Sequence, residues 1–413
     1  MRLLRFLHHE LTRPRGSTEH RFYRSNRRSR SGVALLIVMT SILLMTVLAT
    51  EVTFGAIVRY KLASHQRDEA KAEALATTGI YIYRLILVAS KQLGSNPMIA
   101  GALSSFGINA GDALWQAVPF INTGMMRWIF VSDGDMDEDD QERLESEGMT
   151  DEEIAESRES KSSSKRNFLD FDGDFFAEAI DEERRINVSN FTATNYTELL
   201  EDASALRLYG LMSGLEHDQF FYDHNIERWE LIGNLVDWVD ADNTRVFQGG
   251  LEDSLYDTLD DPYLPKHAGF DSTNEIRLVD GWHDDDIWER YGENLTIYGA
   301  GAININTAND EVLGALLKAY IDPLPSDAYL VDLLLLIREY KLLAHFSNAQ
   351  SFISFLESQN VNVKPEMKKA ITTQSTVFRV TSTGEVNKST VTIEAVFDFK
   401  KKSIGEILYW RIL

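Results

Sequence analysis

An uninterrupted apolar segment opens the regular part of the chain. Val33–Thr50 contains no charged residue, and the stretch after Glu51 is again rich in apolar residues, so the segment reaches the about 20 residues that a membrane-spanning helix needs. Apolar residues then continue at helical spacing to about Lys91, with charged residues on the other faces. The pattern predicts one helix, roughly 90 Å long if unbroken, with residues 33–58 in a membrane and the later half packed on a soluble domain.

Two short alternating segments farther along the chain, Ile186–Asn190 and Ile303–Thr307, each end in polar residues that suit a helix cap. We expect a helix after each of them. The first helix could run to Gly210, and the second starts near Asp310 with Thr307 as its N-cap. This approximate internal repeat suggests two related helical modules, although two unrelated strand-to-helix turns would give the same pattern.

Strict alternation returns near the C-terminus. Val377–Gly384 and Ser389–Phe397 place apolar side chains at every second position on either side of a turn. This pattern is typical of a half-buried β-hairpin, which can pack on the soluble half of the long helix.

Composition narrows the class of protein. The chain has 413 residues, of which 44% are hydrophobic, and this is enough core-forming material for roughly two to three domains. A formal net charge of -23 argues against nucleic acid as a partner, because the chain repels phosphate. The absence of cysteine excludes disulfides, thiolate metal sites and cysteine nucleophiles.

The negative charge is concentrated in one low-complexity region. Asp133–Glu159 is mostly acidic, and Ser160–Lys165 continues as polar chain, so residues 133–178 are predicted to form a flexible, solvated insertion. Asp133–Asp137 and Asp170–Asp174 imitate the start of an EF-hand calcium loop. Neither has glycine at the sixth position, so we place no calcium there.

Positive charge is concentrated before the apolar segment. Residues 1–32 hold nine arginines against two acidic residues, which predicts a cytoplasmic N-terminus and a translocated remainder. Three interpretations fit this arrangement: a cleaved secretory signal, an uncleaved anchor, or a leader that is cut on its cytoplasmic side between Gly32 and Val33. A far-side cleavage site is poor here, since Leu48–Thr50 matches the usual small-residue pattern badly.

Five carboxylates gather at the end of a predicted amphipathic helix that includes Leu231–Val239 and in the loop after it: Asp237, Asp240, Asp242, Glu252 and Asp253. Grouped carboxylates must be screened by water or neutralised by a cation. Hard oxygen ligands with no histidine or cysteine nearby favour Ca²⁺ over zinc or a redox metal. A solvated helix end followed by an acidic loop is the alternative, although the helix dipole disfavours acids at a C-terminus.

Enzyme motifs are missing from the sequence. It contains no nucleophile elbow, P-loop, HExxH or dinucleotide fingerprint, and its nine histidines are dispersed. His217 and His224 are expected to be surface or core residues, and Asp284–Asp286 an exposed turn. We therefore expect no catalytic residues, although paired acids in a membrane-anchored hydrolase are the rival interpretation.

Several segments together resemble a known family. A glycine between arginines and an apolar helix, as at Gly32, resembles the processing site of type IV pilins and pseudopilins. Four segments resemble, in order, the pattern of the minor pseudopilin K family of type II secretion systems: Asp237-Trp238-Val239-Asp240-Ala241-Asp242, Gly250-Leu251-Glu252-Asp253, the Pro262–Pro265 turn and Glu275–Val279. The resemblance implies that Glu275–Val279 is a strand. Three departures are Leu251 for the usual alanine, Ile276 for the usual leucine, and Ile37 where most pilins have glutamate at the fifth position after the cut.

The resemblance implies an α+β fold in which a long pilin-like N-terminal helix packs on a small antiparallel sheet, with a large inserted helical (SAM-like) domain that holds two calcium ions. The implied division of the chain is a cleaved basic prepilin leader (1–32), the transmembrane half of the helix (33–58), its soluble half with the start of the pilin-like core (59–132), the acidic insertion (133–178), the inserted domain (179–345) and the rest of the core with the hairpin (346–413).

The function that the resemblance implies is that of a minor pseudopilin at the tip of the pseudopilus, which initiates its assembly and supports export of folded proteins across the outer membrane. Implied partners are the minor pseudopilins I and J, then H, the major pseudopilin, the prepilin peptidase, the inner-membrane assembly platform and inner-membrane lipid. The implied location is a single pass through the inner membrane with the C-terminal domain in the periplasm. A membrane-anchored calcium-binding adhesin or other periplasmic interaction protein would share every feature except processing after Gly32.

Overall fold

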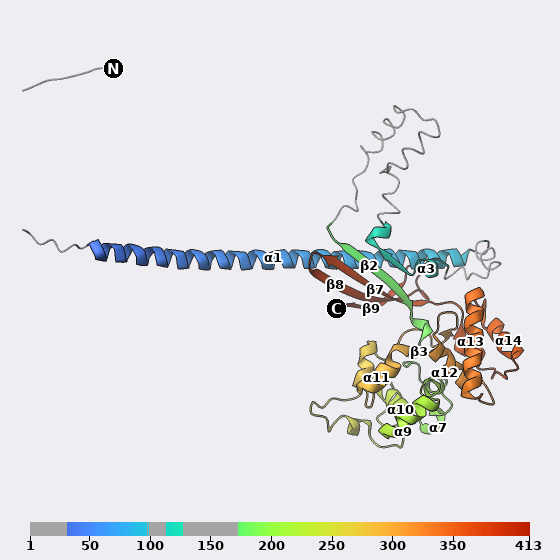
Figure 1. Cartoon of the computed structure of the whole chain (residues 1–413). Coiled ribbons are helices and arrows are strands. Elements are labelled where there is room, and N and C mark those ends of the chain that lie inside the picture. Colours follow the sequence, from blue (N-terminus) through green and yellow to red (C-terminus); the bar gives the residue numbers. More distant parts are fainter. Residues whose placement is uncertain (1–30, 97, 99–112, 127–171) are drawn as a thin grey trace, which may run out of the picture. The chain divides into compact units, whose positions relative to one another are not determined.

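The computed structural model describes residues 31–96, 98, 113–126 and 172–413 (Figure 1). Nearly all of the predicted basic leader, and residues 133–171 of the predicted acidic insertion, lie outside these described residues. The chain divides into two units, Met1–Ser64 and His65–Leu413. Each unit is described by itself below.

The described part of the first unit is helical throughout. It belongs to α1 (Ser31–Ser95), whose apolar side chains in this unit are largely exposed, for example Leu35, Ile42 and Met45. The Thr46 and Thr53 hydroxyls donate to carbonyl oxygens one turn earlier in the helix, which satisfies them without water. Among the described residues, α1 is the one helix long and apolar enough to cross a membrane, and an 18-residue stretch of it has a mean hydropathy of 2.5. This fits a single-pass membrane anchor.

The second unit contains a five-stranded sheet with every neighbouring pair antiparallel, in the order β1-β2-β7-β8-β9. The strands are β1 (Phe120–Asn122), β2 (Asp174–Asp181), β7 (Val377–Val386), β8 (Ser389–Asp398) and β9 (Glu406–Ile412). The predicted C-terminal hairpin is confirmed as β7 and β8, which pair in register from Val377 with Asp398 to Val386 with Ser389. Asn387 supplies the left-handed backbone, with φ of 56°, that its tight turn requires.

Within this unit, one face of α1 packs on the sheet. These buried helix residues recur every three or four positions: Ala72, Ala76, Ile80, Tyr83 and Leu87. They share a core with inward-facing strand residues such as Phe378, Val380 and Ile393. The predicted α+β fold, a long N-terminal helix packed on an antiparallel sheet and accompanied by further helices, is confirmed.

Small residues allow α1 and β7 to approach closely. A Cβ atom at Gly384 would lie 2.0 Å from the carbonyl oxygen of Ala72, and one at Gly79 would lie 2.2 Å from the Ser382 hydroxyl oxygen. The backbones can therefore meet only where side chains are absent.

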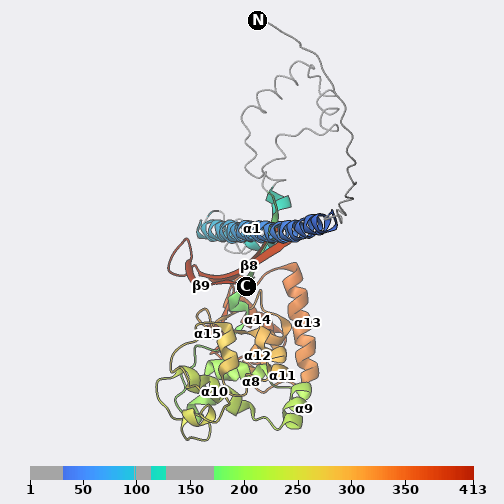
Figure 2. The same cartoon turned by 90° about the vertical axis from the view of Figure 1, so that its left-hand side faces the viewer.

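The helical part of the second unit gathers into one body with its own apolar core (Figure 2). Its helices are α7 (Tyr196–Leu199), α8 (Ala203–Leu211), α9 (Leu215–His224), α10 (Arg228–Val239), α11 (Asp285–Tyr291), α12 (Asp310–Tyr320), α13 (Asp327–Leu343), α14 (Ala349–Ser358) and α15 (Met367–Ala370); α3 (Ala113–Ala117) lies outside this core. The 3₁₀ turns are η1 (Glu182–Arg184), η2 (Glu252–Leu255), η3 (Thr273–Leu278) and η4 (Gly292–Asn294). Trp282, Phe346 and Phe352 are among its largest fully buried side chains.

Two short parallel strand pairs flank these helices. They are β3 (Ile186–Asn187) with β4 (Leu295–Thr296), and β5 (Ile303–Asn304) with β6 (Ile371–Thr372). The side-chain oxygen of Asn187 accepts from the backbone of Ser189, and that of Asn304 accepts from the backbone of Asn306. The two segments of the predicted repeat therefore form the same local turn. Their relation as modules stays a prediction.

The helices after these strands differ from the sequence expectation in detail. The first predicted helix is two helices, α7 and α8, because Asp202 caps a new N-terminus by accepting from the backbone of Ser204 and Ala205. The second helix, α12, is capped by Asn309 instead of Thr307. The Thr307 hydroxyl donates to Asp181 instead.

Three further expectations were wrong. Glu275–Val279, expected as a strand, includes most of η3, because Ile276, Val279 and Trp282 are all buried and three residues apart. The predicted insertion ends too late, since β2 begins at Asp174. The helical core also continues past residue 345, through Phe346 and on to Ile371, so the predicted boundary falls inside this core.

Buried charged residues join the sheet to the helical part. At the end of β2, Asp181 accepts from Asn304, Ser375 and Thr307. Glu182 is fully buried and pairs with Arg185 at 3.0 Å and with Arg379 on β7. Burial alone would raise the pKa of Glu182, but the two guanidinium groups outweigh it and lower that pKa.

Candidate metal centre

Helix α10 positions two of the predicted metal ligands. Leu231, Leu235 and Trp238 bury one face of this helix, which confirms the amphipathic helix expected from the sequence. Asp237 lies in its last turn and is 2% exposed, and Asp240 is the C-cap residue, where the backbone becomes extended. The end of the helix therefore projects two carboxylates at the start of the following loop.

A tight turn brings the chain back to these carboxylates. Gln248, Gly249 and Gly250 have positive φ values of 61°, 69° and 100°, which glycine adopts without strain at the last two positions. A β-bridge between Thr244 and Leu251 closes the turn. Glu252 then begins the 3₁₀ turn η2 and is fully buried.

Asp240, Glu252 and His267 converge at this point. One ligand atom from each lies within 4.8 Å of the others. The Nδ1 atom of His267 lies 3.5 Å from a carboxylate oxygen of Glu252. The interpretation that no histidine lies near the carboxylates was therefore wrong. His267 lies fifteen positions after Glu252, beyond η2 and a stretch of irregular chain, and no spacing rule in the sequence marks such a contact.

Most polar atoms of this cluster are buried without a partner. Within the described part of the chain, nothing hydrogen-bonds to Asp237 Oδ2, to either carboxylate oxygen of Asp240 and Glu252, or to His267 Nδ1. A buried, unpaired carboxylate is costly, and several together also repel one another. A cation among them would satisfy these atoms and neutralise their charge.

The electrostatics of the carboxylates agree with this geometry. Burial, followed by the charge of Asp240, raises the pKa of Asp237 to about 7, although a hydrogen bond from the backbone of Val246 opposes the shift. Burial and Asp242 raise the pKa of Asp240 to about 6. Burial and the neighbouring acids raise the pKa of Glu252 to about 8. Ionising these carboxylates therefore costs more than it would in water, and a positive charge among them would offset that cost.

The other two predicted ligands lie at the rim of the cluster. Asp242 is exposed, and its Oδ1 accepts from the backbone N–H of Thr244 at 2.8 Å. Asp253 accepts from the side chain of Asn243 at 3.1 Å. Each of them holds the turn with one oxygen. The structure thus brings Asp237, Asp240 and Glu252 together and places Asp242 and Asp253 beside them.

An aromatic group fixes the loop against α10. Trp238 makes edge contacts with Tyr256 and Tyr263, at ring-centroid distances of 5.7 Å and 6.2 Å. The indole N–H of Trp238 also donates to Glu275 at 3.2 Å, and the same glutamate pairs with Lys266, next to His267. These contacts hold the ligand-bearing segments in place from outside the cluster.

The donor set fits a hard divalent cation. Five unpaired carboxylate oxygens suit Ca²⁺, which takes six to eight oxygen ligands and accepts irregular geometry. An imidazole nitrogen is more typical of zinc and other transition metals.

The remaining sequence candidates have structural roles. Asp284, in the segment expected as an exposed turn, is the N-cap of α11. His217 contacts the Tyr291 hydroxyl at 2.8 Å, and His224 bonds the Phe220 carbonyl oxygen. The predicted processing residues Gly32 and Val33 lie in the first turn of α1, and both are exposed.

Residues 184–299 match the family described as type II secretion system (T2SS), protein K. Type II secretion system protein K of Aeromonas hydrophila is 31% identical over 107 residues, which cover 24% of this chain and 31% of that relative. The match thus spans about a third of the relative's length. The crystal structure of the GspK-GspI-GspJ complex from the enterotoxigenic Escherichia coli type 2 secretion system is similar over 59% of this chain and 80% of that chain, with 16% identity and a TM-score of 0.44.

The stretch that matches the family contains α10, η2 and all residues of the candidate metal centre. Over this stretch the resemblance found in the sequence is therefore confirmed: residues 184–299 match the protein K family of type II secretion systems.

Proposed function

We propose that this protein sits at the tip of a type II secretion pseudopilus, initiates its assembly and thereby supports export of folded proteins across the outer membrane. The observation that carries this proposal is the large helical body attached to the helix-and-sheet core. Such a body fits more easily at the end of a fibre of packed helices than within it. Its role is structural, without a catalytic step.

Ile37 supports the same position. In pilin-like fibres, the glutamate at the fifth mature position is thought to neutralise the N-terminal amine of the subunit above, inside an apolar core where an unpaired charge is costly. Ile37 cannot neutralise an amine. A subunit at the tip has no subunit above it, so it needs no such partner.

Processing and location belong to the same proposal. The prepilin peptidase cuts between Gly32 and Val33 at the cytoplasmic face, and Val33 becomes the methylated N-terminus. The apolar start of α1 stays in the inner membrane, and the second unit lies in the periplasm. Exposed apolar side chains on α1 beyond the membrane segment, such as Tyr81 and Leu85, are available to the other minor pseudopilins and then to the major one. The assembly platform and membrane lipid contact the apolar start of α1, which precedes Tyr81 and Leu85.

We also propose that Ca²⁺ is the structural ion of this family member. It would bind Asp237, Asp240 and Glu252, with Asp242 and Asp253 completing the set. Its support is the group of buried carboxylate oxygens without partners. The ion would fasten the loop that follows α10 and thus stabilise the helical body.

Deletion of the whole chain, scored for secretion and for pseudopilus formation, tests the tip role. We expect both to fail. Intact secretion and assembly would contradict the proposal. In a second strain, Ile37→Glu should impair assembly, because it places an unpaired carboxylate in the membrane. Normal assembly by that variant would leave the tip role standing and refute the explanation from Ile37.

A further inference from the structure

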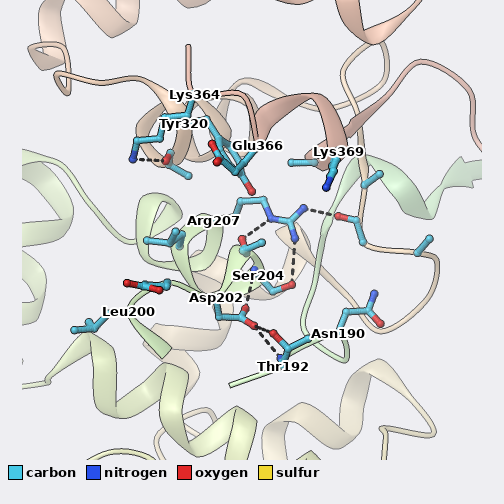
Figure 3. A pocket seen from close by; sticks show the side chains of 18 residues that line it. Asn190, Thr192, Leu200, Asp202, Ser204, Arg207, Tyr320, Lys364, Glu366 and Lys369 are labelled. Carbon is cyan, nitrogen blue, oxygen red and sulfur yellow. Dashed lines mark hydrogen bonds between the residues drawn. The ribbon is translucent and has the colours of Figure 1, made fainter. Parts of the chain in front are cut away.

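A pocket of about 630 Å³ lies in the helical body, lined by none of the candidate metal ligands. Its walls come from the start of α8, the loop at residues 300–302, the end of α12 and the segment that contains α15. Figure 3 shows Lys364, Glu366 and Lys369 on one side, Asp202, Thr192 and Asn190 on the other, and Arg207 between them. Its volume is that of an ordinary site for a small ligand.

Arg207 brings a buried positive charge to this pocket. The residue is 4% exposed, and its guanidinium donates to the carbonyl oxygens of Ala203 and Gly301 and to the Ser204 hydroxyl. These contacts use three of the five N–H groups, so each terminal nitrogen keeps one N–H that no described residue accepts. No carboxylate in the described part of the chain forms an ion pair with Arg207. The guanidinium is a planar fork of donors, and the two N–H groups that are unused here are available to a carboxylate ligand.

The other charges around the pocket leave this fork available. Asp202 is buried, but its carboxylate already accepts four hydrogen bonds, from the backbone of Ser204, Ala205 and Thr192 and from the Thr192 hydroxyl. Glu201 and Glu366 are exposed. The Lys364 ammonium makes one long bond of 3.4 Å to the Ala319 carbonyl oxygen, and the side chain of the exposed Lys369 makes no hydrogen bond or ion pair with a described residue.

We propose that this pocket binds the C-terminal carboxylate of a peptide. Arg207 holds the carboxylate with its fork, and Lys369 adds a second positive charge. Glu366, across the same pocket, accepts from the amide N–H that lies next to a peptide's terminal carboxylate. Leu200, Leu206 and Ala370 supply apolar wall for the last side chain. The ligand is therefore an end of a polypeptide, a chemistry that serves either an assembly partner or an exported protein.

Saturation-transfer NMR with the full chain in detergent tests this inference. The first probe is N-acetyl-Gly-Ala-Leu with a free carboxylate, and the second is the same peptide with a C-terminal carboxamide. The third is isovalerate, which carries a carboxylate on a similar aliphatic chain but no amide. We expect the free peptide to bind about tenfold more tightly than the carboxamide and about fivefold more tightly than isovalerate, as the loss of a charged or a neutral hydrogen bond predicts.

Two variants locate the binding. Arg207→Lys keeps the charge but loses the fork, and should weaken binding of the free peptide about tenfold. Lys369→Gln changes an exposed side chain without a described contact and should weaken it about threefold. Lys368→Gln, on the neighbouring exposed lysine outside the pocket, is the matched control and should have no effect.

Equal binding of the peptide and its carboxamide, or no binding of either at millimolar concentration, would overturn the proposal. Equal binding of isovalerate would overturn its assignment to a peptide end. Binding that survives both Arg207→Lys and Lys369→Gln would show that the carboxylate binds elsewhere. If Arg207→Lys does not fold, Lys369→Gln decides the outcome alone.

Discussion

At the scale of single residues, the burial of Glu252 determines how the candidate metal centre responds to its ion. Both of its carboxylate oxygens are buried without a partner among the described residues, and the neighbouring acids raise its pKa to about 8. Without a cation the residue therefore destabilises the fold. With one, it becomes a ligand.

We therefore expect Glu252→Gln to raise the melting temperature in chelator and to lower it in calcium. In chelator the variant should melt above the parent chain, because glutamine avoids the cost of burying a carboxyl group whose pKa is raised to about 8. In millimolar calcium it should melt below the parent chain, because an ion that binds only the folded state stabilises it according to its affinity. Thermal unfolding of the full chain in detergent, followed by tryptophan fluorescence, measures both. Asp240→Ala should likewise remove most of the difference that calcium makes.

Glu216→Gln is the matched control, because that side chain is 86% exposed and far from the cluster in sequence. It should leave the effect of calcium unchanged. If calcium has no effect on the parent chain, the calcium proposal is refuted. If zinc stabilises the chain and calcium does not, His267 is a ligand and the choice of ion was wrong.

Asp181 makes a second prediction at this scale. Burial raises its pKa to about 7, against 3.8 for the free side chain, although the hydroxyls of Ser375 and Thr307 oppose the shift. Between about pH 4 and pH 7 the folded chain therefore holds a proton that the unfolded chain has released. This residue lowers the stability as the pH rises through that window, by at most about 1.4 kcal/mol per pH unit.

The side chain of Asp181→Asn cannot titrate, so the stability of this variant should lack the fall with rising pH that Asp181 causes. Urea unfolding of the variant and the parent chain at several pH values measures the difference between them, in which other titrating groups cancel. As the pH rises from 5 to 7, the free energy of unfolding of the variant should increase relative to that of the parent chain. The size of this increase follows from the Asp181 pKa of about 7. A difference that stays constant with pH would contradict a proton on Asp181 in the folded state.

At the scale of elements, the contact between α1 and β7 depends on the missing side chain of Gly384. We expect Gly384→Ala to destabilise the sheet by about 2 kcal/mol or more, because the new methyl group would meet the Ala72 carbonyl oxygen at 2.0 Å. The free energy of unfolding in urea, measured on the full chain in detergent, gives this value.

Gly314→Ala in α12 is the control for that experiment. Its Cβ would have Leu334 as its nearest neighbour at 3.7 Å, an ordinary contact. Because alanine also favours a helix by up to about 1 kcal/mol over glycine, this variant should be as stable as the parent chain or more so. Equal stability of both variants would show that α1 and β7 are not closely packed.

At the scale of the whole molecule, the proposed cut after Gly32 decides between a pseudopilin and an anchored adhesin. Gly32→Val should leave the full-length chain, because the larger side chain does not fit a peptidase site shaped around glycine. Mass spectrometry of membrane-extracted protein measures the N-terminus. Gly55→Val is a close control, since Gly55 also lies in α1 with open space around its Cβ position. It should be processed normally. An uncut parent chain would favour the adhesin.

Much of the fold was determined by the sequence itself, because it rests on local periodicity. Apolar spacing of three to four residues marked α1 and α10, and spacing of two residues marked β7 and β8. The fold class and the resemblance to the protein K family were also recognised from short contiguous motifs. In each case the residues that decide the outcome are close together in the chain.

The tertiary structure decided what depends on contacts between distant segments. In the structure Asn309, and not Thr307, caps α12, because the Thr307 hydroxyl donates to Asp181 on another element. The tertiary structure turned the expected strand at Glu275–Val279 into a 3₁₀ turn, since burial there recurs every three residues. It also brought His267 to Glu252 and left Arg207 with a free fork in a pocket. Such contacts depend on how loops close and which charges lose their water, and neither is written in local spacing.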